Sequence, residues 1–281
     1  LTTAQVNAMD VGQLNALSSD QLQALTTSHI QALSSSQLNG LSSDAVQNLT
    51  SSELRAITSA QLITVDVAQL DLLTSAQVQS LTTGQVQALT TTQVQALTST
   101  QLNSMDTAQV KNLSSAQVQV LTSSQLNALV STAVQAIDTA DLQAVGTAVL
   151  RALAGATLNK LSDGQIEALT STQLQSLTST QLNTLDSSTV QTLGEAGINT
   201  LTSTQMATLN SASVANLSTA QIAGLTTGNL RAITSAALSS MSTEQLNALD
   251  SVQVQALTVS QVQSLSSSQL NSMDTAQVAN L

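Results

Sequence analysis

The chain of 281 residues contains no Cys, no Pro and no aromatic side chain. The absence of Cys excludes disulfides and Cys-ligated metals, and it leaves the redox compartment undecided. Phe, Tyr and Trp normally dominate protein cores and interfaces. A core without them is built from smaller aliphatic side chains, so we expect it to be thin.

Charged residues are also scarce, at 7% of the chain. The net charge of −11 comes from 16 acidic residues against five basic ones, Arg55, Lys111, Arg151, Lys160 and Arg231. Five scattered cations cannot form a stripe that neutralises phosphates, so we expect no nucleic-acid partner. No apolar run approaches the roughly 18 residues of a membrane span, so no membrane span is expected either.

What the chain does have is a strict period of eight residues. A large aliphatic residue stands at every eighth position from Leu1 to Leu281, and a second series follows five residues behind, from Val6 to Val278. The unit reads L-[TSD]-[ST]-x-Q-[VL]-[QN]-[AS]. Such a period predicts one small structural unit stacked many times. We therefore expect residues 1–281 to form a single tandem array of 35 octads, a segment of a longer repeat protein. Aliphatics at fixed phase also argue against disorder, because disordered tracts lack them.

The polar positions of the octad match the chemistry of helix starts. In the unit from Leu89, Thr90 is followed three residues later by Gln93, which is the capping-box spacing. The second position is Ser, Thr, Asp or Asn in 31 of the 35 octads, and these are the preferred N-cap residues. Gln fills the fifth position in 23 octads. Each octad therefore predicts one short helix, here Thr91 to Ala96.

The aliphatic spacing has a cause in the same scheme. With Thr90 as N-cap, Leu89 precedes the cap and Val94 is the fourth helical residue, which is the spacing of a hydrophobic staple. Val94 and Leu97 are three residues apart and share a helical face. Helices of under two turns are not stable alone, so the octads must stack. We predict an all-α solenoid of very short capped helices, with both aliphatic series pointing to the axis.

Two other architectures remain as alternatives. A continuous supercoiled helix would carry an apolar spacing of 4.0 instead of 3.6 and would bury a Ser/Thr pair in every second turn. A β-solenoid needs alternation with period two, whereas spacings of three and five place the two aliphatic series on opposite faces of a strand.

Further details of the solenoid follow from the octad. Small residues at the fourth and eighth positions let neighbouring turns approach closely, and the seventh position, mostly Gln or Asn, is expected to face solvent. We expect three octads per solenoid turn, although no period of 16 or 24 residues is visible. The stretches A-G-A-T from Ala154 and G-E-A-G from Gly194 lack both cap and Gln, which predicts local soft spots.

No catalytic, cofactor-binding or metal-binding residue is predicted. His29, the single histidine, replaces the fifth-position Gln of one octad and is interpreted as a cap variant. Asp138 and Asp141 fit a capping box better than a catalytic carboxylate pair. No nucleophile motif, phosphate loop or calcium loop occurs, so we expect neither an enzyme nor a small-molecule substrate. The seven second-position Asp residues are explained as N-caps, where a carboxylate is stabilised by the helix N-terminus: Asp10, Asp66, Asp106, Asp138, Asp186, Asp250 and Asp274.

Tandem units such as LTTGQVQA, LTTTQVQA and LTSTQLNS resemble the octapeptide-repeat regions of giant bacterial surface and secreted proteins described as adhesin-like or haemagglutinin-like. The resemblance covers the whole chain. It implies an extracellular or cell-surface setting and a structural role, and it carries over no binding residue.

The leading functional interpretation is an extracellular structural repeat protein that forms a stalk, fibre or filament and self-associates into fibres or bundles. An array of equivalent units can be lengthened by duplication, because each repeat contacts mainly its neighbours. The alternative is an ice- or polysaccharide-binding solenoid, in which the Ser and Thr residues at positions two and three line up as hydroxyl ladders.

Overall fold

The computed structural model describes all 281 residues, and it consists of 35 short α-helices without a strand. The predicted all-α solenoid of short helices is confirmed, and the two alternatives, the continuous helix and the β-solenoid, are wrong. The fold divides into two units, Leu1–Val145 and Gly146–Leu281, each described here by itself. The prediction of a single array over residues 1–281 stays a prediction.

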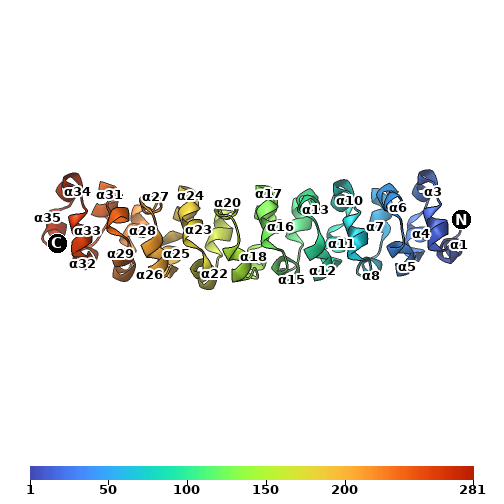
Figure 1. The fold of residues 1–281 in the computed structure, drawn as a ribbon, viewed down its shortest axis with the longest axis horizontal. Helices are drawn as coiled ribbons and strands as arrows, with labels where there is room; N and C mark the ends of the chain where they lie inside the picture. The colour runs from blue at the N-terminus through green and yellow to red at the C-terminus, as the bar shows by residue number, and fades with distance from the viewer. The chain divides into compact units, whose positions relative to one another are not determined.

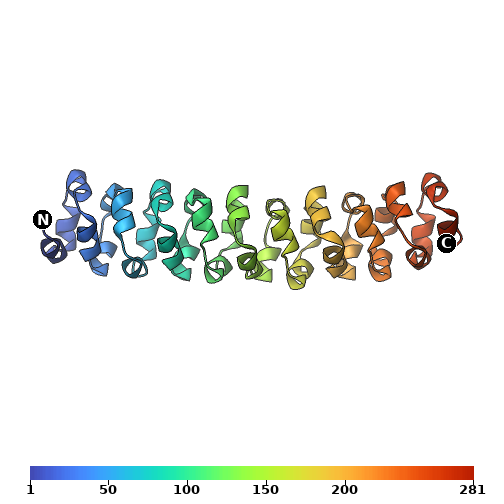
Figure 2. The same ribbon diagram turned by 180° about the vertical axis from the view of Figure 1, so that it is seen from behind.

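The helices follow one another at intervals of one octad (Figure 1), and Figure 2 shows them from behind. The first unit holds α1 (Thr3–Ala8), α2 (Val11–Asn15), α3 (Ser19–Gln23), α4 (Thr27–Ala32), α5 (Ser35–Asn39), α6 (Ser43–Asn48), α7 (Ser51–Ala56), α8 (Ser59–Leu62), α9 (Val67–Asp71), α10 (Ser75–Ser80), α11 (Thr83–Ala88), α12 (Thr91–Ala96), α13 (Ser99–Ser104), α14 (Thr107–Lys111), α15 (Ser115–Gln119), α16 (Ser123–Ala128), α17 (Ser131–Ala136) and α18 (Thr139–Gln143). The second unit holds α19 (Thr147–Arg151), α20 (Gly155–Leu158), α21 (Asp163–Glu167), α22 (Ser171–Ser176), α23 (Ser179–Thr184), α24 (Ser187–Thr192), α25 (Gly194–Thr200), α26 (Ser203–Thr208), α27 (Ser211–Ala215), α28 (Thr219–Ala223), α29 (Thr227–Ala232), α30 (Ser235–Leu238), α31 (Thr243–Asn247), α32 (Ser251–Ala256), α33 (Val259–Gln263), α34 (Ser267–Ser272) and α35 (Thr275–Val278).

Helix α12 shows how one octad folds. Thr90 is extended, with φ −68° and ψ 158°, and its Oγ1 accepts from the Gln93 backbone N–H at 3.2 Å. The Gln93 side-chain Oε1 accepts in return from the Thr90 N–H at 2.8 Å, which completes the capping box. The helix ends where the Leu97 N–H donates to the Val94 carbonyl and Leu97 turns extended again. The predicted helix from Thr91 to Ala96 is therefore confirmed, and a side-chain cap is present in all but five of the 35 helices.

Both aliphatic series form the core of each unit. Val94 is completely buried and Leu97 is 5% exposed, and most other first- and sixth-position residues are buried as well. Burial of one such side chain contributes about 1.5–3 kcal/mol, so the octad depends on its neighbours for the rest of the ordering free energy.

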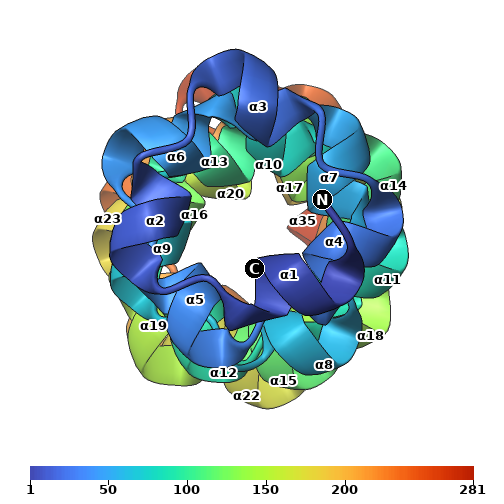
Figure 3. The ribbon, with the colours of Figure 1, turned by 90° about the vertical axis from the view of Figure 1, so that its right-hand side faces the viewer.

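Each unit winds as a solenoid in which a helix packs on the one three positions later. In the first unit, α1, α2 and α3 surround the axis and α4 comes to lie against α1 (Figure 3). Hydrogen bonds between successive solenoid turns join residues 25 to 31 positions apart. One solenoid turn therefore takes between three and four octads, so the expectation of three was too low.

The main link between turns comes from the fifth-position glutamine. The Gln93 Nε2 donates to the Leu62 carbonyl at 2.8 Å and to the Val65 carbonyl at 2.7 Å, 31 and 28 residues earlier. We call this arrangement the glutamine clamp: Oε1 on the N-cap N–H of its own helix and Nε2 on carbonyls of the preceding solenoid turn. Ten fifth-position glutamines of the first unit and eight of the second make such bonds to carbonyls of their own unit. They are Gln37, Gln61, Gln69, Gln77, Gln85, Gln93, Gln101, Gln109, Gln117, Gln125, Gln181, Gln205, Gln221, Gln245, Gln253, Gln261, Gln269 and Gln277.

Small residues at the eighth position meet the third position of the preceding solenoid turn. A Cβ on Gly40 would lie 2.6 Å from a Val11 methyl carbon, and one on Gly224 would overlap the side chain of Glu195. The same pair of positions is joined by a hydrogen bond between Ser35 and Thr64. The expected close approach at the eighth position is therefore observed.

The glutamine clamp predicts a large loss of stability on substitution of Gln93 by Ala. This change leaves the Thr90 N–H without its acceptor and the Val65 carbonyl without a donor, and the Leu62 carbonyl keeps only the Val65 N–H. The free energy of unfolding should therefore fall by about 2–4 kcal/mol. Urea denaturation measures this difference, and the Thr90 amide should exchange faster with solvent. The matched control is Gln95→Ala, two residues away on the exposed face, which should stay within about 0.5 kcal/mol. Equal losses for both variants would contradict the clamp.

Candidate functional site

His29 takes part in a helix cap. Its Nδ1 accepts from the Thr26 N–H at 3.1 Å, and the Thr26 Oγ1 accepts from the His29 N–H. The structure thus confirms the interpretation of His29 as a capping-box variant.

The second-position aspartates cap helices in five of seven cases as expected, through the N–H of the third helical residue. Asp66 makes no side-chain cap bond. Asp138 accepts from the Ala140 N–H instead of that of Asp141, and Asp141 accepts from the Ser115 hydroxyl of the preceding solenoid turn. The predicted capping box between Asp138 and Asp141 is therefore wrong, because the shorter Asp side chain at 141 bonds across the turn instead of reaching back.

Among the N-cap aspartates, Asp186 has a shifted pKa. Its Oδ1 accepts from the Thr189 backbone N–H at 2.8 Å and from the Ser188 hydroxyl at 2.8 Å. These two hydrogen bonds, the backbone one foremost, favour the charged carboxylate and lower the pKa of Asp186.

The seventh position does more than face solvent, which corrects the sequence-based expectation. The Asn103 Nδ2 donates to the Ala128 carbonyl at 2.9 Å, and its Oδ1 accepts from the Val130 N–H at 2.9 Å. Val130 is the N-cap residue of α17, in an octad whose fifth residue is Ala133, so no Gln is present to accept from the Val130 N–H. Asn103 replaces the missing Oε1 from the preceding solenoid turn. We call this the asparagine bridge.

The asparagine bridge recurs where the glutamine clamp is absent. Bonds of the same kind, to N–H groups 27 residues later, are made by Asn15, Asn159, Asn183 and Asn199 at octads whose fifth residue is Ala45, Thr189, Ser213 and Asn229. Asn39 makes the bridge beside a Gln: it accepts from the Asp66 N–H, and the Gln69 Oε1 is left buried without a partner.

The sequence contains a signal for the asparagine bridge, which the sequence-based prediction did not use. Asn occupies ten seventh positions, and nine of these have a residue 30 positions later within the chain. In six of the nine that residue is not Gln, whereas over all octads only 12 of 35 lack Gln. The pairing has a spacing of 30 residues, so a search for multiples of eight cannot find it.

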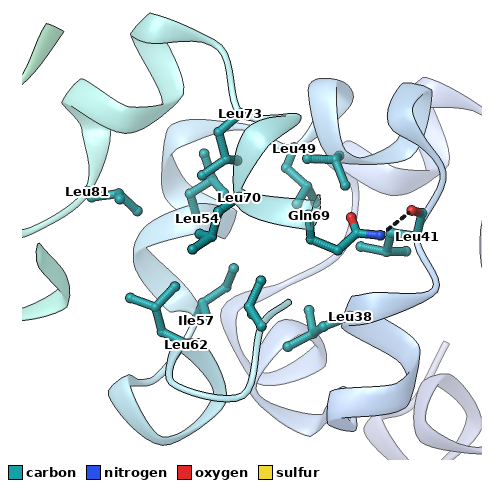
Figure 4. A pocket seen from close by; sticks show the side chains of 12 residues that line it. Leu38, Leu41, Leu49, Leu54, Ile57, Leu62, Gln69, Leu70, Leu73 and Leu81 are labelled. Atoms are coloured by element: carbon teal, nitrogen blue, oxygen red, sulfur yellow. Dashed lines mark hydrogen bonds between the residues drawn. The ribbon is translucent and has the colours of Figure 1, made fainter. Parts of the chain in front are cut away.

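Other polar groups link solenoid turns or line small cavities. Arg55 donates from Nε to the Ser80 carbonyl at 2.7 Å, which links two solenoid turns. No three His, Asp or Glu side chains gather where a metal ion could bind them. None of the helices is both long and apolar enough to cross a membrane. On the axis of the first unit, a cavity of about 40 Å³ is lined by Leu, Val and Ile side chains and Gln69, whose amide donates to the Leu41 carbonyl (Figure 4).

The asparagine bridge leads to a reciprocal prediction. Asn103→Ala should lower the free energy of unfolding by about 1–2 kcal/mol, because the Val130 N–H and the Ala128 carbonyl lose their partners. Adding Ala133→Gln to this variant should restore most of the loss, since the new Gln places its Oε1 on the Val130 N–H in the space that Asn103 vacates. Denaturation of both variants measures the rescue. If the double variant is less stable than Asn103→Ala alone, the Gln side chain does not replace the Asn side chain as acceptor, and the interpretation is wrong.

The lowered pKa of Asp186 gives a pH dependence with a defined sign. A depressed pKa in the folded state means that the stabilisation is present above the ordinary Asp value of about 3.9 and is lost as the pH falls through the folded-state pKa. A carboxyl titration by NMR should therefore place the midpoint of Asp186 below 3.9. Ser188→Ala should raise that midpoint, and an unchanged midpoint would exclude the Ser188 hydroxyl as a cause.

The comparison with known families gives one match. A model of the ALTTAQ repeat matches residues 1–27, 19–51, 99–131, 134–171 and 225–259, which together cover more than half of the chain. Among curated proteins, none matches this chain. The matched segments follow the octads from which the solenoid turns are built, and since they cover more than half of the chain, the chain belongs to the ALTTAQ repeat family.

Proposed function

We propose that the chain is part of an extracellular structural repeat protein that forms a stalk, fibre or filament. One observation carries the proposal: glutamine clamps join solenoid turns to the turns before them, with the same 28- to 31-residue spacing in both units. Each turn is thus stabilised by its neighbours, and length can be added without changing any contact.

The composition supports a mechanical role over a chemical one. Few charges and no aromatic or Cys residues leave little for recognition or redox chemistry. Hot spots of protein–protein interfaces are enriched in Trp, Tyr and Arg. The chain has three Arg and neither Trp nor Tyr. The extracellular location is supported by the resemblance of the octads to repeats of long bacterial surface proteins. Self-association into bundles is part of the same proposal.

The alternative, an ice- or polysaccharide-binding surface of hydroxyl ladders, is supported less well. Second-position hydroxyls such as Thr90 Oγ1 already accept a cap hydrogen bond. Third-position residues meet the eighth position of the next solenoid turn, as Ser35 meets Thr64, instead of another third position. The spacing between turns is not a multiple of eight, so equal positions do not stack into a ladder.

The structural role predicts how particle length depends on repeat number. A chain with residues 1–280 duplicated in tandem should give particles of doubled length and unchanged width in negative-stain electron microscopy. Sedimentation over a range of concentrations tests self-association in the same samples. Monodisperse globular particles whose diameter grows with chain length would refute the proposal.

A further inference from the structure

The octad that begins at Leu193 departs from the others in its backbone. Leu193 is helical, with φ −56° and ψ −22°, whereas first residues such as Leu185 and Leu201 are extended. Gly194 follows with φ +63°, a conformation that glycine adopts at little cost. The result is that a single residue, Leu193, separates α24 from α25, which begins without a side-chain cap.

The same octad lacks the glutamine clamp, because its fifth residue is Gly197. By the spacing of the other clamps, a Gln at this position would donate to the carbonyls of Ile166 and Leu169, 31 and 28 residues earlier. The next octad shows the complete arrangement, with the Gln205 Nε2 donating to the carbonyls of Leu174 and Leu177 at 3.0 and 2.9 Å.

A cavity of about 410 Å³ lies beside the position of the missing side chain, where a Cβ on Gly197 would come within 3.2 Å of the Leu193 Cβ. Ile166, Leu169 and Gly197 all line it, so the two carbonyl-bearing residues of the vacant clamp border the same space. Leu174 and Leu193 add apolar walls. The volume falls within the range of small-molecule sites.

Two carboxylates without a side-chain partner line the cavity, those of Glu167 and Glu195. Glu167 lines it, is exposed, and takes part in no hydrogen bond or ion pair. Glu167 is a seventh-position residue, and asparagines at that position reach the carbonyl 25 residues later and the N–H 27 residues later. For Glu167 these are Thr192 and Gly194, which both line the cavity. No basic residue lines it to neutralise the charge.

We propose that this cavity binds an aliphatic primary ammonium ion. The ammonium group has three N–H donors and no acceptor, and it takes the place of the missing Gln Nε2 against the carbonyls of Ile166 and Leu169. Glu167 and Glu195 supply the opposite charge, and Leu174 and Leu193 contact the methylene chain. An amide ligand fits less well, because the N-cap geometry that would donate to its oxygen is absent at Gly194.

The test is a titration of the full chain with n-butylammonium chloride at constant ionic strength, followed through the backbone amides of Gly194 and Gly197 by NMR. Saturable shifts of both amides are expected, and n-butanol, which has the same carbon chain without the charge, should give none. Equal shifts with butanol would overturn the ammonium assignment, as would non-saturating shifts with both compounds.

Two variants locate the site. Gly197→Gln restores the clamp residue and fills the cavity, so it should abolish saturable binding. If that variant loses helical dichroism, Glu167→Gln still decides the question: the dissociation constant should rise about tenfold or more. The matched control, Glu244→Gln, removes an exposed carboxylate from α31 in the same unit and should leave the dissociation constant unchanged within about twofold. Unchanged binding by Glu167→Gln, or an equal loss in the control, would show only general attraction to an acidic chain.

Discussion

A primary carboxamide has one acceptor oxygen and two donor hydrogens, and the fifth-position glutamine uses all of them. The Gln93 oxygen satisfies the N-cap N–H of its own helix, while its nitrogen binds two carbonyls at the junction of two helices in the preceding solenoid turn. The first task is local and the second is long-range, so one side chain both starts a helix and fixes it to the stack. Backbone groups left free at the ends of short helices would otherwise be buried without partners.

This double role explains why Gln is preferred over Glu at the fifth position. A carboxylate can accept from the cap but has no hydrogen to offer the carbonyls. Glu53 shows the consequence: its Oε2 accepts from the Thr50 N–H, while its Oε1 is buried and has no hydrogen-bond partner. His29, near the start of the chain, makes only the cap hydrogen bond, in which its Nδ1 accepts from the Thr26 N–H.

The sequence predicted the octad's local structure well and the solenoid's pitch poorly. The cap at Thr90, the helix from Thr91 to Ala96 and the burial of Val94 and Leu97 all follow from interactions within nine residues, and such spacings can be read directly. The number of octads per turn depends on backbone angles at every corner, and the resulting spacing of 28 to 31 residues is not a multiple of eight. Neighbours in space are therefore different positions of the octad, as with Asn103 and Val130, and their pairing leaves no visible super-period. For the same reason Gln93 was predicted as a cap residue, without its bonds to Leu62 and Val65.

Octads without Gln at the fifth position show what the clamp contributes, because their structures differ from one another. Where Ala133 stands in place of Gln, Asn103 of the preceding turn supplies the acceptor, and the helix keeps its ordinary extended N-cap residue. Where Gly197 stands in place of Gln, the seventh-position residue 30 positions earlier is Glu167, which cannot donate, and the backbone changes instead: Leu193 becomes helical and its carbonyl accepts from the Gly197 N–H. The clamp of the next turn adjusts in response, since the Gln221 Nε2 donates to the Gly194 carbonyl in place of that of Leu193. The array therefore tolerates a missing clamp through a substitute amide at Ala133 and through a local change of path beside a cavity at Gly197. At Ala237 it does so with neither, since Thr234 keeps an extended N-cap conformation and residue 207 is Ala.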